Sequence, residues 1–305
     1  MDNLKGKTAF ITGGASGIGL GIAKACAKEG MNVVIVDLRQ NAIDEALALF
    51  KENNWPAFGV QLDVTDREAY PGAVDQAEAH FGNIHLLVNN AGIGCKGGPM
   101  WNLTDKETDL GINVNLTAVF NGVQAIVPRM LKHGEESHVV STASKAAILP
   151  CPNTGLYNVT KAAVFCLMEQ LAEDLVGTNV SASAFCPGGY ETSLGLSSGI
   201  VTAKHLGGAT PPPPKPRTGQ AAQDWNDVIR SADDAGERVV RGVKRGDLYI
   251  LTHAEFKKGV EARVNAIIRA FPDETPNPRY REVFPFLVWN DIFDKQTQVP
   301  ALKKS

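Results

Sequence analysis

The stretch Thr12-Gly13-Gly14-Ala15-Ser16-Gly17-Ile18-Gly19 decides the fold. It follows a short apolar run at 7–11 and opens a helical pattern at 17–29, so it is a glycine-rich turn between a strand and a helix. Glycines at 13, 17 and 19 let the backbone turn sharply and approach a phosphate without a clash from Cβ. The helix presents unpaired N–H groups and its positive dipole end to a pyrophosphate. The stretch therefore predicts a dinucleotide site, with a tight turn that packs helix on strand as the alternative.

The rest of the chain continues the alternation of strand and helix. Continuous aliphatic runs predict strands that are covered on both faces, and apolar stripes of helical period lie between them. The predicted strands are 7–11, 33–36, 58–62, 84–88, 137–141, 180–185 and 248–251, and the predicted helices are 17–29, 41–53, 67–81, 105–131 (in one or two pieces) and 157–175. This order predicts an α/β protein, a single doubly wound Rossmann domain with a mostly parallel seven-stranded sheet.

The pattern changes after about residue 190. Eleven of the 17 prolines lie from Pro187 onward, and the run at 211–216 excludes a helix interior or a central strand there. That run is a stiff extended loop. We expect one domain over 1–305, with a substrate-loop insertion at about 193–247 and a C-terminal helix plus tail at about 253–305.

Composition argues against several classes of protein. The net charge is −3 and no basic cluster occurs, so the sequence does not favour nucleic-acid binding. No uncharged apolar run of about 18 residues or more and no signal-peptide layout occurs, so we expect a cytoplasmic protein without a membrane span. The five cysteines include no C-x-x-C pair and the six histidines no H-E-x-x-H, so we expect reduced thiols and no metal site.

Two acidic residues bear on the choice of cofactor. Asp37 ends the second predicted strand, where a carboxylate accepts hydrogen bonds from the adenosine ribose and repels a 2′-phosphate. The sequence therefore favours NAD over NADP, although Arg39 nearby weakens that preference. Asp63 follows the third strand, where it caps the next helix or bonds the adenine amino group; the sequence does not choose between these roles.

Several segments together resemble the short-chain dehydrogenase/reductase family over roughly residues 5–192. The matching segments are the 12–19 turn, Asn89-Asn90-Ala91-Gly92, the spacing of Ser144, Tyr157 and Lys161, and Pro187-Gly188 followed by Thr192. In that family a Tyr-x-x-x-Lys pair performs the chemistry, a serine thirteen residues before the tyrosine holds the substrate oxygen, and an asparagine of the preceding helix joins a proton relay. The resemblance implies that the catalytic residues are Asn115, Ser144, Tyr157 and Lys161.

The same resemblance implies where a dinucleotide is held. The asparagine segment closes the fourth strand and supports the sheet, and the Pro187 segment embraces the nicotinamide. With the glycine turn and the two acidic residues, the predicted cofactor-binding residues are Gly13, Ser16, Gly17, Ile18, Gly19, Asp37, Leu38, Asp63, Val64, Asn90, Ala91, Gly92, Tyr157, Lys161, Pro187, Gly188 and Thr192.

The match has departures. Ala147 stands where the family has glycine, and the neighbouring hydroxyls of Ser141 and Thr142 compete with Ser144 for the substrate role. Asn113 lies two residues from Asn115, so one regular helix cannot present both to the cofactor.

Chemistry supports a redox role for the tyrosine and lysine. Tyr157 and Lys161 lie four residues apart on a predicted helix, so they share one side. A phenol titrates near pH ~10, and a nearby ammonium and an oxidised nicotinamide both favour the phenolate. Ser144 donates to the substrate oxygen as charge develops. The sequence thus predicts an NAD-dependent oxidoreductase that interconverts a secondary alcohol and a ketone, with Tyr157 as acid and base.

Two other functions stay open: a non-redox enzyme, such as a cyclase or dehydratase, on the same scaffold, and a cofactor-sensing protein without turnover. The long insertion and tail resemble family members that act on bulky aryl alcohols, including the benzylic alcohol of lignin-derived aryl ethers. The resemblance also implies a homodimer or homotetramer. The tail from Pro272 is rich in aromatic side chains. These side chains cover the pocket, seal a subunit interface or attach the tail to the rest of the protein, and the sequence does not choose among these roles. Candidate wall residues for the substrate are Ile93, Met100, Trp101, Tyr190 and Leu194.

Overall fold

The computed structural model describes residues 1–210, 212 and 218–298. The chain divides into two compact units, Met1–Thr252 and His253–Ser305, and the boundary coincides with the predicted start of the C-terminal helix and tail. The number of domains stays a prediction. Of the proline run predicted as a stiff loop, residues 211 and 213–216 lie outside the described residues.

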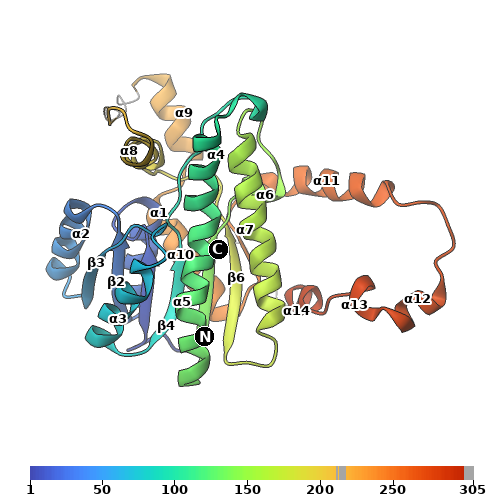
Figure 1. The fold of residues 1–305 in the computed structure, drawn as a ribbon, viewed down its shortest axis with the longest axis horizontal. Helices are drawn as coiled ribbons and strands as arrows, with labels where there is room; N and C mark the ends of the chain where they lie inside the picture. Colours follow the sequence, from blue (N-terminus) through green and yellow to red (C-terminus); the bar gives the residue numbers. More distant parts are fainter. Residues whose placement is uncertain (211, 213–217, 299–305) are drawn as a thin grey trace. The chain divides into compact units, whose positions relative to one another are not determined.

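The first unit is built on a seven-stranded sheet in the order β3-β2-β1-β4-β5-β6-β7 (Figure 1). Every neighbouring pair runs parallel, as the sequence predicted. The strands are β1 (Thr8–Thr12), β2 (Asn32–Asp37), β3 (Ala57–Gln61), β4 (Ile84–Asn89), β5 (Ser137–Thr142), β6 (Val180–Cys186) and β7 (Tyr249–Leu251). Successive strands are added toward one edge of the sheet from β1 to β3 and toward the other edge from β4 to β7. Ligands of such folds bind beyond the carboxyl ends of the strands at this switch point between β1 and β4.

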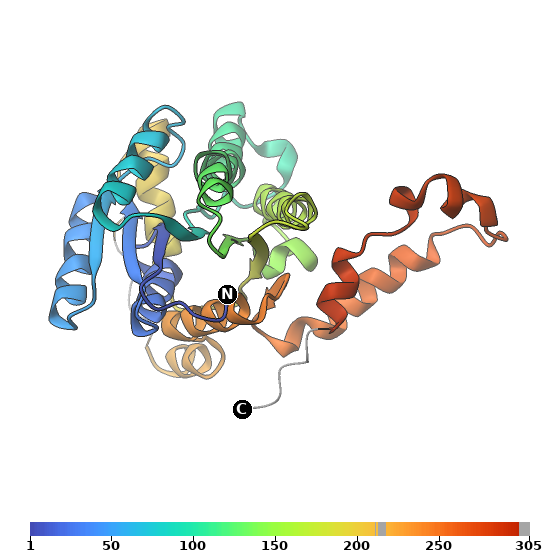
Figure 2. The same cartoon turned by 90° about the horizontal axis from the view of Figure 1, so that it is seen from below.

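Helices cover both faces of the sheet (Figure 2). One face carries α1, α2 and α10, and the other carries α3, α5 and α7, each packed on its own apolar core. The helices of this unit are α1 (Gly17–Lys28), α2 (Gln40–Glu52), α3 (Ala69–Phe81), α4 (Asp105–Ile112), α5 (Ala118–His133), α6 (Lys145–Ile148), α7 (Gly155–Asp174), α8 (Leu194–Leu206), α9 (Gln220–Val228) and α10 (Ala232–Arg245), with short turns η1 (Met100–Asn102) and η2 (Asn113–Thr117).

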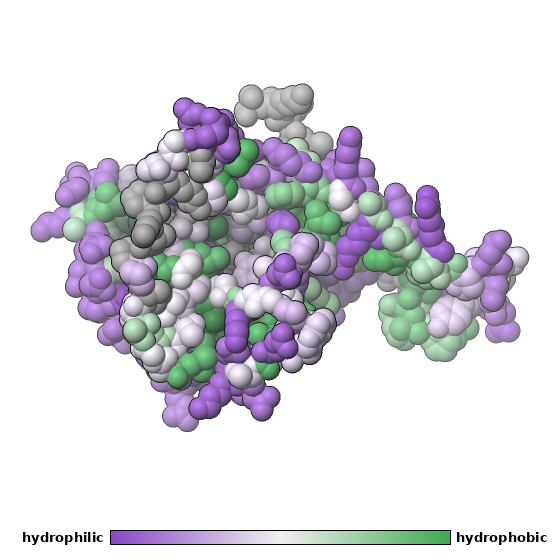
Figure 3. Space-filling model, turned by 90° about the horizontal axis from the view of Figure 1, so that it is seen from above, coloured by the Kyte–Doolittle hydropathy of each residue, from purple (hydrophilic) through white to green (hydrophobic). Residues whose placement is uncertain are grey.

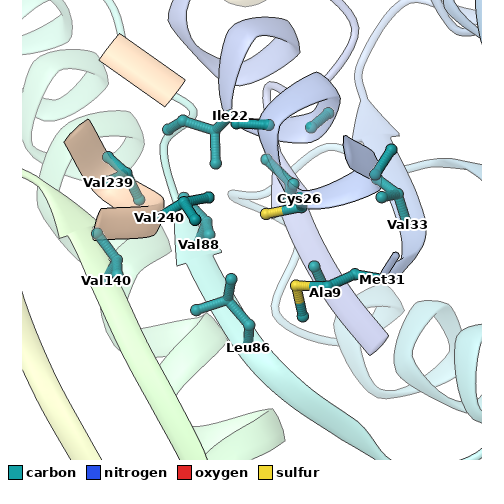
Figure 4. Packing of buried hydrophobic residues seen from close by; sticks show 14 of the residues in the cluster. Ala9, Ile22, Cys26, Met31, Val33, Leu86, Val88, Val140, Val239 and Val240 are labelled. Atoms are coloured by element: carbon teal, nitrogen blue, oxygen red, sulfur yellow. The ribbon is translucent and has the colours of Figure 1, made fainter. Parts of the chain in front are cut away.

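The first core lies where α1 and α10 cross above the sheet (Figure 4). Ile22 of α1, Val239 of α10 and Leu86 of β4 belong to this core, and all three are fully buried. The two helices touch through glycines. A Cβ on Gly21 would overlap the backbone of α10, and a Cβ on Gly236 would overlap the backbone of α1.

Helix α10 corrects the extent of the insertion. The predicted insertion at 193–247 contains this helix, but the helix belongs to the core. The sequence pattern did not assign it to any predicted element. Its buried side chains Ala235, Val239 and Val243 recur every four residues, and Ser231 caps it by accepting from the Asp234 N–H. The proline-rich stretch ahead of it obscured this periodicity. In the structure the inserted part comprises α8 and α9.

The run Asp105–His133 is long and apolar enough to cross a membrane by length and composition, although the sequence predicted no span. It is a core helix of the sheet fold, with Ile126 and Met130 of α5 fully buried. A π-type turn at η2 separates α4 from α5, as the prediction of two pieces allowed.

The second unit contains η3 (Ala254–Phe256), α11 (Lys257–Arg269), α12 (Pro278–Val283), α13 (Pro285–Val288) and α14 (Ile292–Gln298). Helices α11, α12 and α13 contain no buried residue. Phe271 is 72% exposed and Phe286 75%, and hydrophobic residues gather on this unit in Figure 3.

Candidate active site

A cleft opens at the carboxyl ends of the central strands. It is lined by loops that follow β1, β2, β3, β4, β5 and β6, and by α7 and α8. Every predicted cofactor residue except Gly19 lines it, as do Ser144, Tyr157 and Lys161 of the predicted catalytic set. Side chains from distant parts of the sequence therefore meet in one cleft.

The glycine turn forms the floor of this cleft. Gly13 and Gly17 have φ of +61° and +51°, a conformation that L side chains rarely adopt. A Cβ on Gly13 would lie 3.0 Å from Ala91 Cα, and a Cβ on Gly19 would overlap the Gly13 carbonyl. Gly19 therefore serves the packing of the turn. No side chain caps the first turn of α1, whose N–H groups are left for an anion. This cradle fits a dinucleotide pyrophosphate.

At the adenosine end of the cleft, an acidic and a basic side chain, Asp37 and Arg39, lie together. Asp37 is 7% exposed, and its Oδ1 accepts from the Arg39 N–H at 3.1 Å and from Arg39 Nε at 3.2 Å. The guanidinium also donates to Ser16 Oγ at 2.9 Å. The carboxylate suits a ribose and the guanidinium suits a phosphate, so the two side chains favour different cofactors.

Asp63 lies two residues beyond β3. Its Oδ1 accepts from the Thr65 N–H and hydroxyl at 3.1 and 2.7 Å, and its Oδ2 accepts from Lys204 Nζ at 2.7 Å and contacts His205 Nε2 at 3.2 Å. Partial burial raises the pKa of Asp63, but the bonds from Lys204 and Thr65 outweigh it and lower the pKa. Of the two roles left open for Asp63, the helix cap falls to Asp66, which accepts from the first N–H of α3, and the bond to the adenine amino group stays a prediction.

The predicted catalytic pair lies on α7. Lys161 is 4% exposed, donates to the Thr142 carbonyl at 2.8 Å, and has its Nζ 5.7 Å from the centroid of the Tyr157 ring. Ser144 is the N-cap of α6, where its Oγ accepts from the Ala146 N–H.

Burial controls the protonation of both groups. It raises the pKa of Tyr157, and the hydrogen bond with Ser144 offsets only part of this. It lowers the pKa of Lys161 to about 8. Desolvation thus disfavours the charged form of both groups, and the influence of Lys161 on the phenolate stays an expectation.

The neighbouring hydroxyls have separate partners. Ser141 accepts from Asn89 Nδ2 at 3.3 Å, and Thr142 donates to Asn90 Oδ1 at 3.3 Å. Asn90 also donates to the Thr12 carbonyl at 3.1 Å, which ties β1 to the end of β4. These asparagines support the sheet, and Ser144 is the hydroxyl that acts to lower the pKa of Tyr157.

Asn115 lies in the π-type turn and is fully buried, whereas Asn113 is exposed. Its Oδ1 accepts from the Ile93 N–H at 2.8 Å and its Nδ2 donates to the Ile93 carbonyl at 2.9 Å. A Cβ on Gly92 would lie 3.2 Å from Asn115 Oδ1 and 3.3 Å from Lys161 Nζ. Asn115 thus lies next to the lining of the cleft, behind a glycine that both side chains approach.

The substrate side differs in part from the prediction. Ile93, Tyr190 and Leu194 line the cleft, whereas Met100 and Trp101 do not and are 54% and 85% exposed. Helix α8 supplies lining residues that the sequence reading missed. These residues are Ser197, Val201 and His205, which lie four apart, as residues on one side of a helix do. That spacing was the one signal in the sequence, but it lies within a stretch predicted as an irregular insertion. Other lining residues that it missed are Leu62, Val114, Thr142, Gly189 and Ser193.

Cysteine and histidine form no further site among the described residues. All five cysteines are free thiols, and no group of three or more His, Cys, Asp or Glu side chains is placed to hold a metal ion. Cys95 is the thiol next to the cleft, with its Sγ 3.5 Å from Asn115 Nδ2.

Known proteins resemble this chain in sequence and in fold. Residues 7–199 match the family described as short chain dehydrogenase. The chain is 32% identical over 269 residues to C alpha-dehydrogenase of Sphingobium sp. (strain NBRC 103272 / SYK-6), over 88% of this chain and 87% of that protein. A putative short-chain dehydrogenase from Novosphingobium aromaticivorans has a TM-score of 0.80 at 31% identity, over 98% of this chain and 99% of that one. A short chain dehydrogenase/reductase from Burkholderia phymatum, in complex with NAD, has a TM-score of 0.76 at 29% identity, over 91% and 99%.

Proposed function

The chain belongs to the short-chain dehydrogenase family of oxidoreductases, and we propose that it interconverts a secondary alcohol and a ketone with NAD as the hydride carrier. One observation carries the proposal. Ser144, Tyr157 and Lys161 line the same cleft as the glycine turn and Asp37, so a substrate oxygen and a dinucleotide share one space.

The chain's own residues divide the work of holding the cofactor. The first turn of α1 holds the pyrophosphate, Asp37 accepts from the adenosine ribose, and Lys161 bonds the nicotinamide ribose. When bound, NAD would supply the hydride acceptor for oxidation of the alcohol, and NADH the hydride donor for reduction of the ketone. The segment from Pro187 to Thr192, which lines the cleft, would hold the nicotinamide.

Tyr157 moves the proton. In oxidation the Tyr157 phenolate would accept the O–H proton of the alcohol, and in reduction the phenol would return a proton to the ketone oxygen. Ser144 donates to the same oxygen as it gains charge. The raised pKa of Tyr157 keeps the phenol protonated for reduction, and the positive charge of the oxidised nicotinamide favours the phenolate for oxidation. Asn115 positions the proton relay behind Lys161.

Members of the family bind NAD or NADP. A preference for NAD rests on Asp37, whose carboxylate is almost fully buried at the adenosine end. Arg39 already pairs with that carboxylate at 3.2 Å, so its charge is partly neutralised before a cofactor arrives. A 2′-phosphate would add a second anion to this pair.

The substrate side favours a bulky apolar alcohol, and we propose an aryl one. Ile93, Val114, Leu194 and Val201 are apolar residues that line the same cleft as Tyr157. The similarity to C alpha-dehydrogenase extends over 88% of this chain, which includes α8. A homodimer or homotetramer is part of the same proposal.

A spectrophotometric screen tests this function. The purified protein is given NAD or NADP with aryl secondary alcohols, such as 1-phenylethanol, and with aliphatic ones of similar size; the reverse screen uses the ketones with NADH or NADPH. We expect NADH formation to be faster with aryl alcohols and slower with NADP. Tight NADH binding without hydride transfer to or from any substrate would overturn the proposal in favour of a cofactor sensor. Conversion of a substrate without net NADH change would favour the non-redox enzyme.

A further inference from the structure

The segment from Gly188 to Tyr190, the root of α8, precedes this helix and is held against the core. Tyr190 is 6% exposed and donates to Asp234 of α10 at 2.8 Å. The Gly188 N–H donates to the Thr252 hydroxyl, beyond β7, at 3.0 Å. The root cannot move without breaking buried contacts with the core, so it is the fixed end of α8.

The same segment lies over the cofactor cradle. A Cβ on Gly17 would lie 3.4 Å from Thr192 Cβ, so the start of the segment nearly touches the glycine turn. Further along, Ser197, Val201 and His205 follow one another at one-turn spacing and line the cleft. A dinucleotide in the cleft would therefore lie between the glycine turn and α8, and α8 would have to move for it to leave.

The tip of α8 is fastened by charge. Lys204 Nζ lies 2.7 Å and His205 Nε2 3.2 Å from Asp63 Oδ2, across the cleft at the end of β3. The Lys204 side chain is 49% exposed and that of Asp63 21%, so this contact is partly in water, unlike the root. An ion pair of this exposure contributes ~1 kcal/mol or less, so the tip opens more readily than the root.

We propose that Lys204, with His205, latches α8 onto Asp63 and so retains the bound dinucleotide. The inference rests on the proposed function, because it takes NAD or NADH as the ligand. Asp63 has all its oxygens engaged: Oδ1 by Thr65 and Oδ2 by the two residues of α8. Lys204 is a positioning residue, and opening of the latch is part of cofactor release.

Cofactor release is measured directly, without substrate. NADH-loaded protein is mixed with excess NAD in a stopped-flow instrument, and the loss of NADH fluorescence gives the dissociation rate. We expect Lys204→Met to raise this rate about threefold to fivefold, as the loss of a partly exposed ion pair implies. Lys204→Arg keeps the charge and the donor, and it should restore most of the slow release. Lys106→Met, which removes an exposed lysine of α4 outside the cleft lining, is the matched control and should release NADH like the wild type.

A double-mutant cycle identifies the partner. Asp63→Asn keeps an acceptor for Thr65 but loses the charge that holds Lys204. If the two residues act through one contact, the double variant Asp63→Asn/Lys204→Met releases NADH no faster than the quicker single variant. Additive accelerations would show that Lys204 acts elsewhere and would overturn the inference.

Hydrogen exchange tests the latch in the absence of any cofactor. We expect the amides of α8 to exchange faster in Lys204→Met than in the wild type or in Lys106→Met, because opening is more frequent. Unchanged exchange in α8 together with unchanged NADH release would overturn the latch. If the wild-type protein bound no NADH, the proposed function would fail, and the exchange comparison would still decide whether Lys204 holds α8 closed.

Discussion

Lys161 is an ammonium group with almost no access to water, and it links the cleft to the stability of the fold. Burial lowers its pKa from 10.5 to about 8 in the folded protein. Below pH about 8 both the folded and the unfolded chain carry the proton, and the folded state bears the cost of a buried charge. Between the two pKa values the unfolded chain binds more protons, so this lysine makes the free energy of unfolding rise with pH.

Replacing this lysine should therefore stabilise the cofactor-free protein. Lys161→Met removes the buried charge and also the bond to the Thr142 carbonyl, so we expect a net gain of about 2 kcal/mol near pH ~7. The gain should shrink toward pH ~10, where the wild-type lysine is neutral in the folded state. Urea unfolding of both proteins at the two pH values measures it. A difference that does not change with pH would contradict the assignment.

The phenol of Tyr157 is expected to matter for turnover alone. Tyr157→Phe removes the proton donor and acceptor without removing the ring, so kcat should fall by about 10²- to 10⁴-fold. The Kd for NADH, measured by fluorescence titration, should hardly change. Tyr280→Phe, at an exposed tyrosine of α12, is the control. A variant that keeps wild-type kcat would disprove the role of Tyr157 as acid and base.

The pair of Asp37 and Arg39 is expected to set the choice of dinucleotide. Asp37→Ser removes the acceptor for the ribose and leaves the guanidinium of Arg39 without its carboxylate partner. We expect the ratio of kcat/KM for NAD to that for NADP to fall about 10- to 100-fold, as loss of a charged hydrogen bond implies. The double variant Asp37→Ser/Arg39→Met should lose the gain toward NADP. An unchanged ratio in Asp37→Ser would remove the basis for an NAD preference.

At the scale of the element, strands and helices differed in how far the sequence determined them. The strand predicted at 33–36 is confirmed and extends over Asn32–Asp37. It was predictable because an interior parallel strand needs an unbroken aliphatic run, and few other elements contain such a run. Helix α10 escaped prediction although its apolar stripe is regular. Its place in the core depends on the contact of Gly236 with Gly21, more than 200 residues earlier, and no local pattern announces such a contact.

The contact of α1 with α10 gives a test at this scale. Gly236→Ala would place a methyl group on the backbone of Gly21, so the helices must separate, and we expect a loss of about 1–3 kcal/mol in unfolding free energy. Gly72→Ala is the matched control, because this helical glycine of α3 has nothing within 4 Å of its added Cβ. The control should gain about 0.5–1 kcal/mol from helix propensity. Urea unfolding distinguishes them, and equal effects would contradict the tight crossing.

At the scale of the molecule, the sequence predicts those residues of the site that belong to short sequence motifs. The glycine turn, Asp37 and the spacing of Tyr157 and Lys161 are readable because each motif lies within a few residues. Asp63 and Lys204 are 141 residues apart, and nothing near either residue indicates their contact. A short motif also does not indicate how deeply a side chain is buried. The sequence therefore did not predict the raised pKa of Tyr157.

The C-terminal unit provides the last prediction. All residues that line the cleft lie between Gly13 and His205, and both large cores belong to Met1–Thr252. A chain that ends at Thr252 should therefore fold and bind NADH with an unchanged Kd. The exposed aromatic side chains of the removed unit are typical of an interface, so we expect the association state, measured by light scattering, to change instead. Phe286→Ser in the full chain is the companion variant and should shift association in the same direction. A raised KM for the alcohol with unaltered association would show that the tail covers the pocket, and loss of NADH binding would show that the first unit does not suffice.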